Sequence, residues 1–324
     1  YCDVYNVPYY KAKVLIPSLY LSGVMGGEST HTEGQIKENL TKMYECLKQY
    51  PCFGGFILRD EPRGTMSEGY NKWYKFLVND LKVYEEGYML HGALLGMHAA
   101  ELHVSEDGTG SSTLGLTAEQ YTAYMQKYIA GLVGTGEEYL CFDYYPFLET
   151  MKKTGYSART VSYSMLTQYF QNLEIFAKLS EENGFKRSLC LQSVAYYDKA
   201  SYNKVAEDGL SGTFSSYTYH GKVTEEMMTY QLYTALAYGF DRMAYFTYNQ
   251  PSNQRDEEWF TEAAYMWQQQ SDGSYKAVAT DTYTAMKNAN AEIIKAARRT
   301  AGYKWLGTKY SAGTTAAADV FGGT

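Results

Sequence analysis

Residues 54–62 read Gly-Gly-Phe-Ile-Leu-Arg-Asp-Glu-Pro, and this stretch decides the predicted fold. Its apolar centre, preceded by glycines, is typical of a buried parallel strand. Two neighbouring carboxylates, Asp60 and Glu61, follow at the carboxyl end of that strand. In a β/α barrel this end of each strand faces the active site. The alternative is that Asp60 or Glu61 caps the helix or turn that follows.

Extended and helical patterns alternate along the chain. Apolar runs typical of strands occupy residues 11–17, 54–59, 88–95, 138–143, 187–192 and 242–247. Helical periodicity covers residues 32–50, 70–86, 117–133, 162–183, 224–238 and 282–299. The alternation predicts an α/β fold with a parallel sheet, either a closed barrel or a doubly wound open sheet. No G-x-G-x-x-G motif follows the first strand, which disfavours the nucleotide-binding version.

We therefore predict a (β/α)8 TIM barrel over residues 1–302. About six strand-helix units can be counted where a complete barrel has eight, so the chain is expected to lack the N-terminal strands. Residues 303–324 would be a linker or the start of a C-terminal β domain. The chain as a whole is expected to be an internal piece of a longer protein.

Composition excludes several classes of protein. The 324 residues are 45% hydrophobic and 20% charged, which suffices for one large core. A net charge of −7 without a basic stripe argues against a nucleic-acid binder. The spacing of the 5 cysteines matches neither a zinc site nor a disulfide framework. The sequence contains no run of about 18 apolar residues, so no membrane span is predicted. Tyrosine is abundant, with 35 residues, and its ring suits a site that needs an apolar face and a hydrogen-bonding edge.

Four stretches together resemble the successive strand ends of bacterial β-galactosidase-like glycoside hydrolase barrels, relatives of the large retaining-glycosidase clan. They are residues 54–62, 142–147, 191–193 and 236–248. In that clan an Asn-Glu-Pro carries the general acid/base, so the resemblance implies that Glu61 is the proton donor, with Asp60 in place of the Asn. The clan's nucleophile is a second Glu at a later strand end. The matching ends here carry Gln192 with Ser193, and Tyr248 with Asn249, which departs from the retaining pattern.

Glycoside hydrolysis requires two carboxyl groups, one protonated and one ionised. Glu61 is the expected acid. Asp143 is the expected second group because it also ends an apolar strand, although it could instead be a structural carboxylate that binds loop backbone or Arg59. Asp60 is a further alternative. The sequence does not decide between a retaining and an inverting mechanism.

Sugar recognition requires flat apolar faces and neutral groups that replace the water lost by sugar hydroxyls. We expect such groups at the strand ends, although each of them could equally pack the core. Trp259 and Trp267 could form an aromatic floor in the loop region after the last strand, or could pack an outer helix. The expected substrate-binding residues are Asp60, His98, Tyr144, Tyr145, Gln192, Tyr245, Tyr248 and Asn249, with Ser193 beside them.

Three functions are compatible with these residues. The favoured one is a bacterial, secreted O-glycoside hydrolase that cleaves oligo- or polysaccharides in the extracellular or periplasmic space, with carbohydrate as its only expected partner. The second is a carbohydrate-binding barrel that has lost its nucleophile, which Gln192 suggests. The third is a metal-dependent hydrolase or lyase that uses Asp60, Glu61 and His98. The segment from His98 to His103 lacks the H-E-x-x-H spacing of a zinc helix, so no metal or other cofactor is expected.

Overall fold

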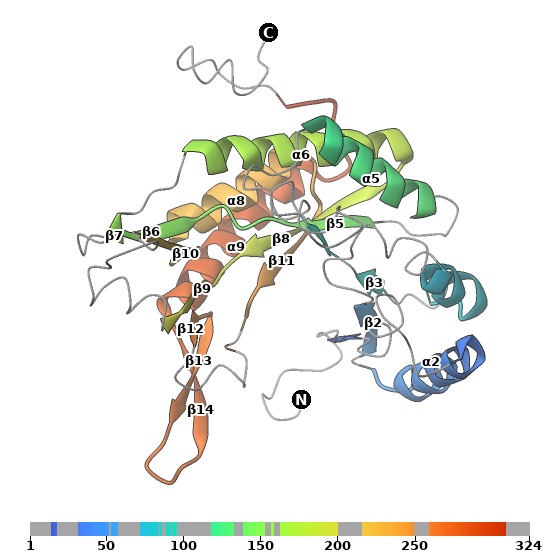
Figure 1. Ribbon diagram of the computed structural model, residues 1–324, viewed down its shortest axis with the longest axis horizontal. Helices are drawn as coiled ribbons and strands as arrows, with labels where there is room; N and C mark the ends of the chain where they lie inside the picture. Colours follow the sequence, from blue (N-terminus) through green and yellow to red (C-terminus); the bar gives the residue numbers. More distant parts are fainter. Residues whose placement is uncertain are drawn as a thin grey trace. The chain divides into compact units, whose positions relative to one another are not determined.

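The computed structural model describes residues 14–17, 32–51, 53–57, 72–83, 85, 89–91, 93–95, 118–132, 139–152, 157–158, 163–199, 216–248, 250 and 259–308. Their helices and strands are labelled in Figure 1. The chain divides into two compact units. The first comprises Tyr1–Asp143 and Lys178–Arg187, and the second comprises Tyr144–Ala177 and Ser188–Thr324.

Parallel strands organise the first unit. Strands β1 (Val14–Pro17), β2 (Phe53–Ile57) and β3 (Met89–His91) form a three-stranded parallel sheet in that order. A further parallel pair joins β4 (Ala93–Leu95) to β5 (Tyr139–Asp143), with Leu95 opposite Asp143. The strand predicted from the glycine-bounded apolar run is therefore confirmed as β2.

In helix α2 (Glu33–Leu47), local sequence determines both where the helix begins and which face is buried. Its first turn is held by a capping box, in which the Thr32 hydroxyl accepts from the Gln35 backbone and the Gln35 side chain accepts from the Thr32 backbone. The buried face of α2 places Tyr44 against Phe53 and Phe56 of β2, with ring centroids 6.3 and 6.2 Å apart. The other helical elements are the π-helical turn η2 (Phe76–Asp80) and α5 (Ala118–Leu132).

The second unit combines parallel and antiparallel strands. Strand β8 (Lys186–Gln192), which enters this unit at Ser188, pairs in parallel with β11 (Arg242–Phe246) and places Gln192 opposite Phe246. An antiparallel sheet has the order β12-β9-β10-β6-β7, and β13 pairs with β14 in a hairpin. The bounds are β6 (Leu148–Lys152), β7 (Ser157–Ala158), β9 (Ala195–Asp198), β10 (Ser216–His220), β12 (Trp259–Glu262), β13 (Tyr265–Gln269) and β14 (Tyr275–Ala279).

Aromatic side chains pack the helices of the second unit. These helices are α6 (Tyr163–Asn183), which leaves the unit after Ala177, α8 (Glu225–Ala237) and α9 (Asp281–Thr300). The Phe170 ring of α6 lies 6.2 Å from that of Tyr230 and 6.5 Å from that of Tyr238. Helices α8 and α9 lie side by side (Figure 1), joined by hydrogen bonds from the Tyr233 hydroxyl to Glu292 and from the Asn288 amide to Glu225. The helical periodicities predicted in this region are thus confirmed.

The structure confirms an α/β protein with parallel strands, and the described residues contain no closed barrel. The prediction that strand and helix alternate throughout is wrong, because an antiparallel sheet and a hairpin intervene. Trp259 and Trp267 lie in strands β12 and β13, not in a loop or on a helix. Such short strands show little periodicity of their own, and antiparallel pairing with distant segments stabilises them.

Candidate functional site

Of the two expected catalytic carboxylates, only Asp143 lies within the described residues. Glu61 lies outside the described residues, four positions beyond the last residue of β2, and Asp60, His98 and Asn249 also lie outside them. Asp143 is the last residue of β5 and is buried, with 6% of its surface exposed. Burial raises the pKa of the Tyr121 hydroxyl well above its usual value, and the charges of Tyr124 and Asp143 add to that effect. The structure therefore places Asp143 at a strand end, as expected, in a sparingly solvated environment.

The side-chain amide of Gln192, which was expected to bind sugar, forms hydrogen bonds to backbone groups of the protein itself. Gln192 is the last residue of β8 and is completely buried. Its Oε1 accepts from the Phe147 backbone N–H at 2.8 Å. Its Nε2 donates to the carbonyl oxygens of Phe147 at 2.9 Å, Gly221 at 3.3 Å and Val194 at 3.4 Å. These bonds join two separate segments, at Phe147 and Gly221, to the end of β8, so the amide has a structural role.

The backbone of the same residue is held by a second buried amide. Gln231, on α8, accepts from the Gln192 backbone N–H at 2.9 Å and donates to the Gln192 carbonyl at 3.0 Å. One residue further on, the Ser193 backbone N–H donates to the Phe246 carbonyl at 2.9 Å, and the Ser193 hydroxyl donates to the Thr247 carbonyl at 3.2 Å. The polar groups of Gln192 and Ser193 therefore have partners within the protein, and those of Ser193 connect the end of β8 to the end of β11.

Aromatic rings gather at the end of β11, and we call Tyr145, His220 and Phe246 the aromatic platform. The rings of Tyr145 and Phe246 are stacked, 5.4 Å apart with an interplanar angle of 19°. His220 meets Tyr145 edge to face at 5.6 Å and 89°. Phe246 is 41% exposed although it ends a parallel strand. The platform thus offers solvent an apolar ring at the position where ligands of α/β proteins bind.

His220 gives the platform a neutral polar group. It is the last residue of β10, and its Nδ1 is buried without a hydrogen-bond partner among the described residues. Desolvation by burial lowers the pKa of the imidazole. The ring is therefore uncharged near neutral pH and can donate a hydrogen bond from one nitrogen and accept one at the other.

The other expected tyrosines divide into packed and exposed ones. Tyr144 is buried against Tyr169 of α6, at 5.5 Å, and burial raises the pKa of its hydroxyl. The Tyr245 hydroxyl donates to Asn290 Oδ1 on α9 at 2.5 Å, and burial raises its pKa to about 12. Tyr248, by contrast, is 54% exposed. The structure therefore exposes Tyr248, buries Tyr144, and leaves Tyr145 and Tyr245 half-buried, with the Tyr245 hydroxyl bonded to α9.

Two members of the platform were missed by sequence reasoning. Phe246 belongs to the apolar run of the predicted strand 242–247 and is not among the expected binding residues. The run Met-Ala-Tyr-Phe has no period-two alternation of apolar and polar residues, so the sequence does not distinguish Phe246 from its neighbours. His220 ends strand β10, which contains no apolar run, so the sequence predicted neither the strand nor the position of His220. Its position depends on pairing with residues of β6 and β9.

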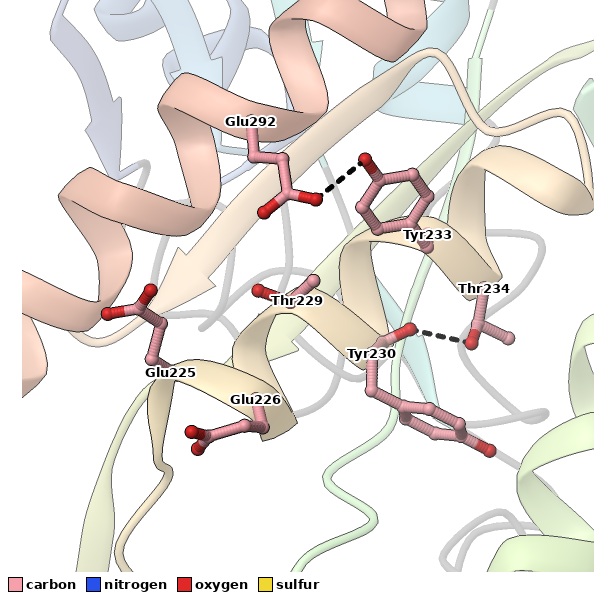
Figure 2. A pocket seen from close by; sticks show the side chains of 7 residues that line it. All are labelled: Glu225, Glu226, Thr229, Tyr230, Tyr233, Thr234 and Glu292. Atoms are coloured by element: carbon pink, nitrogen blue, oxygen red, sulfur yellow. Dashed lines mark hydrogen bonds between the residues drawn. The ribbon is translucent and has the colours of Figure 1, made fainter.

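A separate hollow of about 480 Å³ lies on the outer helices α8 and α9 (Figure 2). Figure 2 shows the Tyr233 hydroxyl bonded to Glu292 across it. None of the residues expected to bind sugar lines this hollow, and its lining is acidic. The lining residues are Glu225, Glu226, Thr229, Tyr230, Tyr233, Thr234 and Glu292.

Among the described side chains, no three His, Cys, Asp or Glu residues gather closely enough to hold a metal ion. Within the same part of the chain, no helix combines the length and the apolar character that crossing a bilayer requires.

Comparison with known proteins adds little to this picture. No protein-family model matches the chain, and no curated protein does. A solved structure of a "putative alpha-L-fucosidase" from Bacteroides thetaiotaomicron is similar to 80% of the chain, with a TM-score of 0.43 and 12% sequence identity. The match covers 61% of the length of that protein. A likeness of this strength assigns neither a fold nor an activity to this chain.

Proposed function

We propose that the chain is the core of a glycoside hydrolase that cleaves oligo- or polysaccharides, with Glu61 as general acid and Asp143 as the second carboxylate. The observation that supports carbohydrate binding is the exposed ring of Phe246, stacked on Tyr145 at the carboxyl end of a parallel strand. An exposed aromatic ring can cover the C–H face of a sugar, while neighbouring neutral groups replace the water lost by its hydroxyls. The proposal includes a (β/α)8 barrel over residues 1–302 and a secreted bacterial protein.

The catalytic part of the proposal rests on the position of the carboxylates in the sequence. Glu61 follows the confirmed strand β2, and Asp143 ends the confirmed strand β5. A protonated Glu61 would donate a proton to the glycosidic oxygen as the bond between this oxygen and the anomeric carbon breaks. An ionised Asp143 would either attack the anomeric carbon or activate the water that does so.

Turnover of a panel of nitrophenyl glycosides tests the activity. Glu61→Gln preserves the shape of the side chain but removes the proton, so we expect kcat to fall by about 10²–10⁴-fold. The matched control is Glu182→Gln, because Glu182 is exposed on α6. Normal turnover by Glu61→Gln on a substrate with a poor leaving group would remove Glu61 from the mechanism. Loss of wild-type turnover with a chelator would favour a metal-dependent enzyme instead.

Asp143→Asn should lower turnover at least as much as Glu61→Gln, with exposed Asp80→Asn as its control. If azide rescues Asp143→Ala and yields a glycosyl azide of inverted configuration, Asp143 is the nucleophile of a retaining enzyme. Activity of Asp143→Asn within a few-fold of wild type would mean that another carboxylate acts.

The second candidate function is a carbohydrate-binding protein without catalysis. It is favoured by Gln192, which stands at a strand end where the resembled clan carries its nucleophile and whose amide is fully used in structural hydrogen bonds. Wild-type protein that binds oligosaccharides in calorimetry, but turns over none of the glycosides, would establish this second function.

A further inference from the structure

Three tyrosines from three different segments meet in the second unit, and we call them the tyrosine triad. Tyr248 follows β11, Tyr265 begins β13, and Tyr283 lies in the first turn of α9. The ring of Tyr265 lies 5.3 Å from that of Tyr248 and 5.1 Å from that of Tyr283. Tyr248 is 54% exposed, and the other two are half-buried. The triad is therefore a ring-lined surface that solvent reaches at Tyr248.

Backbone hydrogen bonds hold the exposed member in place. The Tyr265 backbone N–H donates to the Tyr248 carbonyl at 3.0 Å, and the Gln250 backbone N–H donates to the Tyr265 carbonyl at 2.9 Å. Gln250 is in turn fixed by Trp267, whose indole N–H donates to the Gln250 carbonyl at 2.8 Å and whose backbone N–H donates to Gln250 Oε1 at 3.3 Å. The backbone of Tyr248 is thus fixed and its ring lies against that of Tyr265, which lowers the entropy cost of binding.

The hydroxyl groups of the triad are neighbours as well as the rings. Desolvation, and then the adjacent hydroxyls of Tyr248 and Tyr283, raise the pKa of Tyr265 to about 12. The Tyr265 phenol therefore stays protonated at any physiological pH. A protonated phenol both donates and accepts a hydrogen bond, as a sugar hydroxyl does.

Two carboxylates that precede members of the triad in sequence pair with the same lysine. Lys222 Nζ is paired with Glu262 Oε1 at 2.8 Å and with Asp281 Oδ2 at 3.4 Å. Glu262 precedes Tyr265 by three positions, and Asp281 precedes Tyr283 by two. This ion-paired group carries one positive and two negative charges, which disfavours an anionic ligand and suits a neutral one.

We propose that the tyrosine triad is a binding subsite for a neutral, hydroxyl-rich sugar unit of an oligosaccharide chain, next to the unit held by the aromatic platform. This inference rests on the proposed carbohydrate function. Tyr248 follows Phe246 by two positions, so their Cα atoms are at most about 7 Å apart. Adjacent units of one sugar chain can therefore contact both. The triad would favour long oligosaccharides over short ones.

Binding of neutral oligosaccharides of increasing length tests the proposal. The probes are gluco-, galacto- and xylo-oligosaccharides with their monosaccharides, measured by calorimetry on wild type and on Tyr248→Phe, Tyr265→Phe and Tyr283→Phe. Each change keeps the ring and deletes one hydroxyl, so we expect the affinity for long probes to fall by about two- to tenfold and the gain in affinity with length to shrink. The matched control is Tyr303→Phe, because Tyr303 is 82% exposed and outside the triad.

The outcomes separate this inference from the proposed function. Unchanged affinity for long probes in all three variants, with thermal unfolding also unchanged, would overturn the subsite and leave the glycosidase proposal intact if Glu61→Gln still abolishes turnover. Tighter binding of sulfated or carboxylated oligosaccharides, weakened by salt, would overturn the neutral ligand class. Wild type that neither binds nor cleaves any probe would overturn both proposals.

Discussion

The carboxyl ends of β8 and β11 occupy paired positions, yet they have opposite properties. Gln192 lies directly opposite Phe246 in the register of the two strands. Gln192 is completely buried, and both the oxygen and the nitrogen of its side-chain amide form hydrogen bonds. Phe246, by contrast, is 41% exposed and stacks on Tyr145. The difference lies in what covers each end. Backbone of Phe147, Val194 and Gly221 encloses the glutamine amide.

This contrast separates scaffold from candidate site within one pair of strands. A polar side chain at a strand end suggests ligand binding from sequence, but a buried amide that completes backbone hydrogen bonds stabilises the fold instead. An apolar side chain suggests core, but an exposed ring on a rigid strand end is a recognition surface. Residue type alone would have assigned the two roles the other way round.

The largest expected effect is on stability, from Gln192→Ala. The change leaves a buried N–H and up to three carbonyl groups without their partner, so the free energy of unfolding should fall by about 2–4 kcal/mol. Chemical denaturation measures this loss. The control is exposed Gln268→Ala, which should change stability by less than about 0.5 kcal/mol. A stable Gln192→Ala protein that no longer binds sugar would reverse the comparison and return Gln192 to the site.

The next effect is on binding, from Phe246→Ala. Removal of the exposed ring should weaken oligosaccharide affinity by about five- to thirtyfold, which corresponds to about 1–2 kcal/mol. Stability should fall less than in Gln192→Ala, because Phe246 is only partly buried. Exposed Ile294→Ala on α9 is the control for loss of surface apolar area. Full affinity in the Phe246 variant would show that the platform is not a recognition surface.

A smaller effect distinguishes Tyr245 from Tyr145, both of which are expected to bind substrate. Tyr245→Phe deletes the hydroxyl bonded to Asn290 and should lower stability by about 0.5–1.5 kcal/mol without changing sugar affinity. Tyr145→Phe deletes a hydroxyl whose contact with Cys190 Sγ, at 3.7 Å, is weak, so stability should barely change while affinity falls. Melting temperature and calorimetry on both variants measure the split. The opposite split would exchange the packing and binding roles.

The smallest effect is a pH dependence from His220. Burial lowers its pKa in the folded protein, whereas the unfolded chain titrates near 6.5. Below about pH 6.5 the unfolded state binds a proton that the folded state refuses, so stability should decrease as pH falls through 6.5 toward the folded-state pKa. His220→Phe should remove this component from denaturation curves measured across that range. An identical pH slope in wild type and variant would mean that His220 is not held neutral by burial.

The sequence by itself determined the elements whose signals are local. The capping residues Thr32 and Thr224 set the starts of α2 and α8, and Gly184 follows the end of α6 in the left-handed conformation, with φ at 76°. Apolar runs located β2, β5, β8 and β11, because strands in the interior of a parallel sheet are largely apolar. The α/β class follows from their order.

Only the tertiary structure decided which strand-end side chains face solvent. The bonds that bury Gln192 come from Phe147 and Gln231, 45 and 39 positions away, and no local pattern announces such pairings. The antiparallel sheet that carries His220, and the hairpin that carries Tyr265, likewise depend on partners distant in sequence. Burial is a property of the assembled fold, so the same side chain is half-buried and bonded to α9 at Tyr245 but meets solvent at Tyr248.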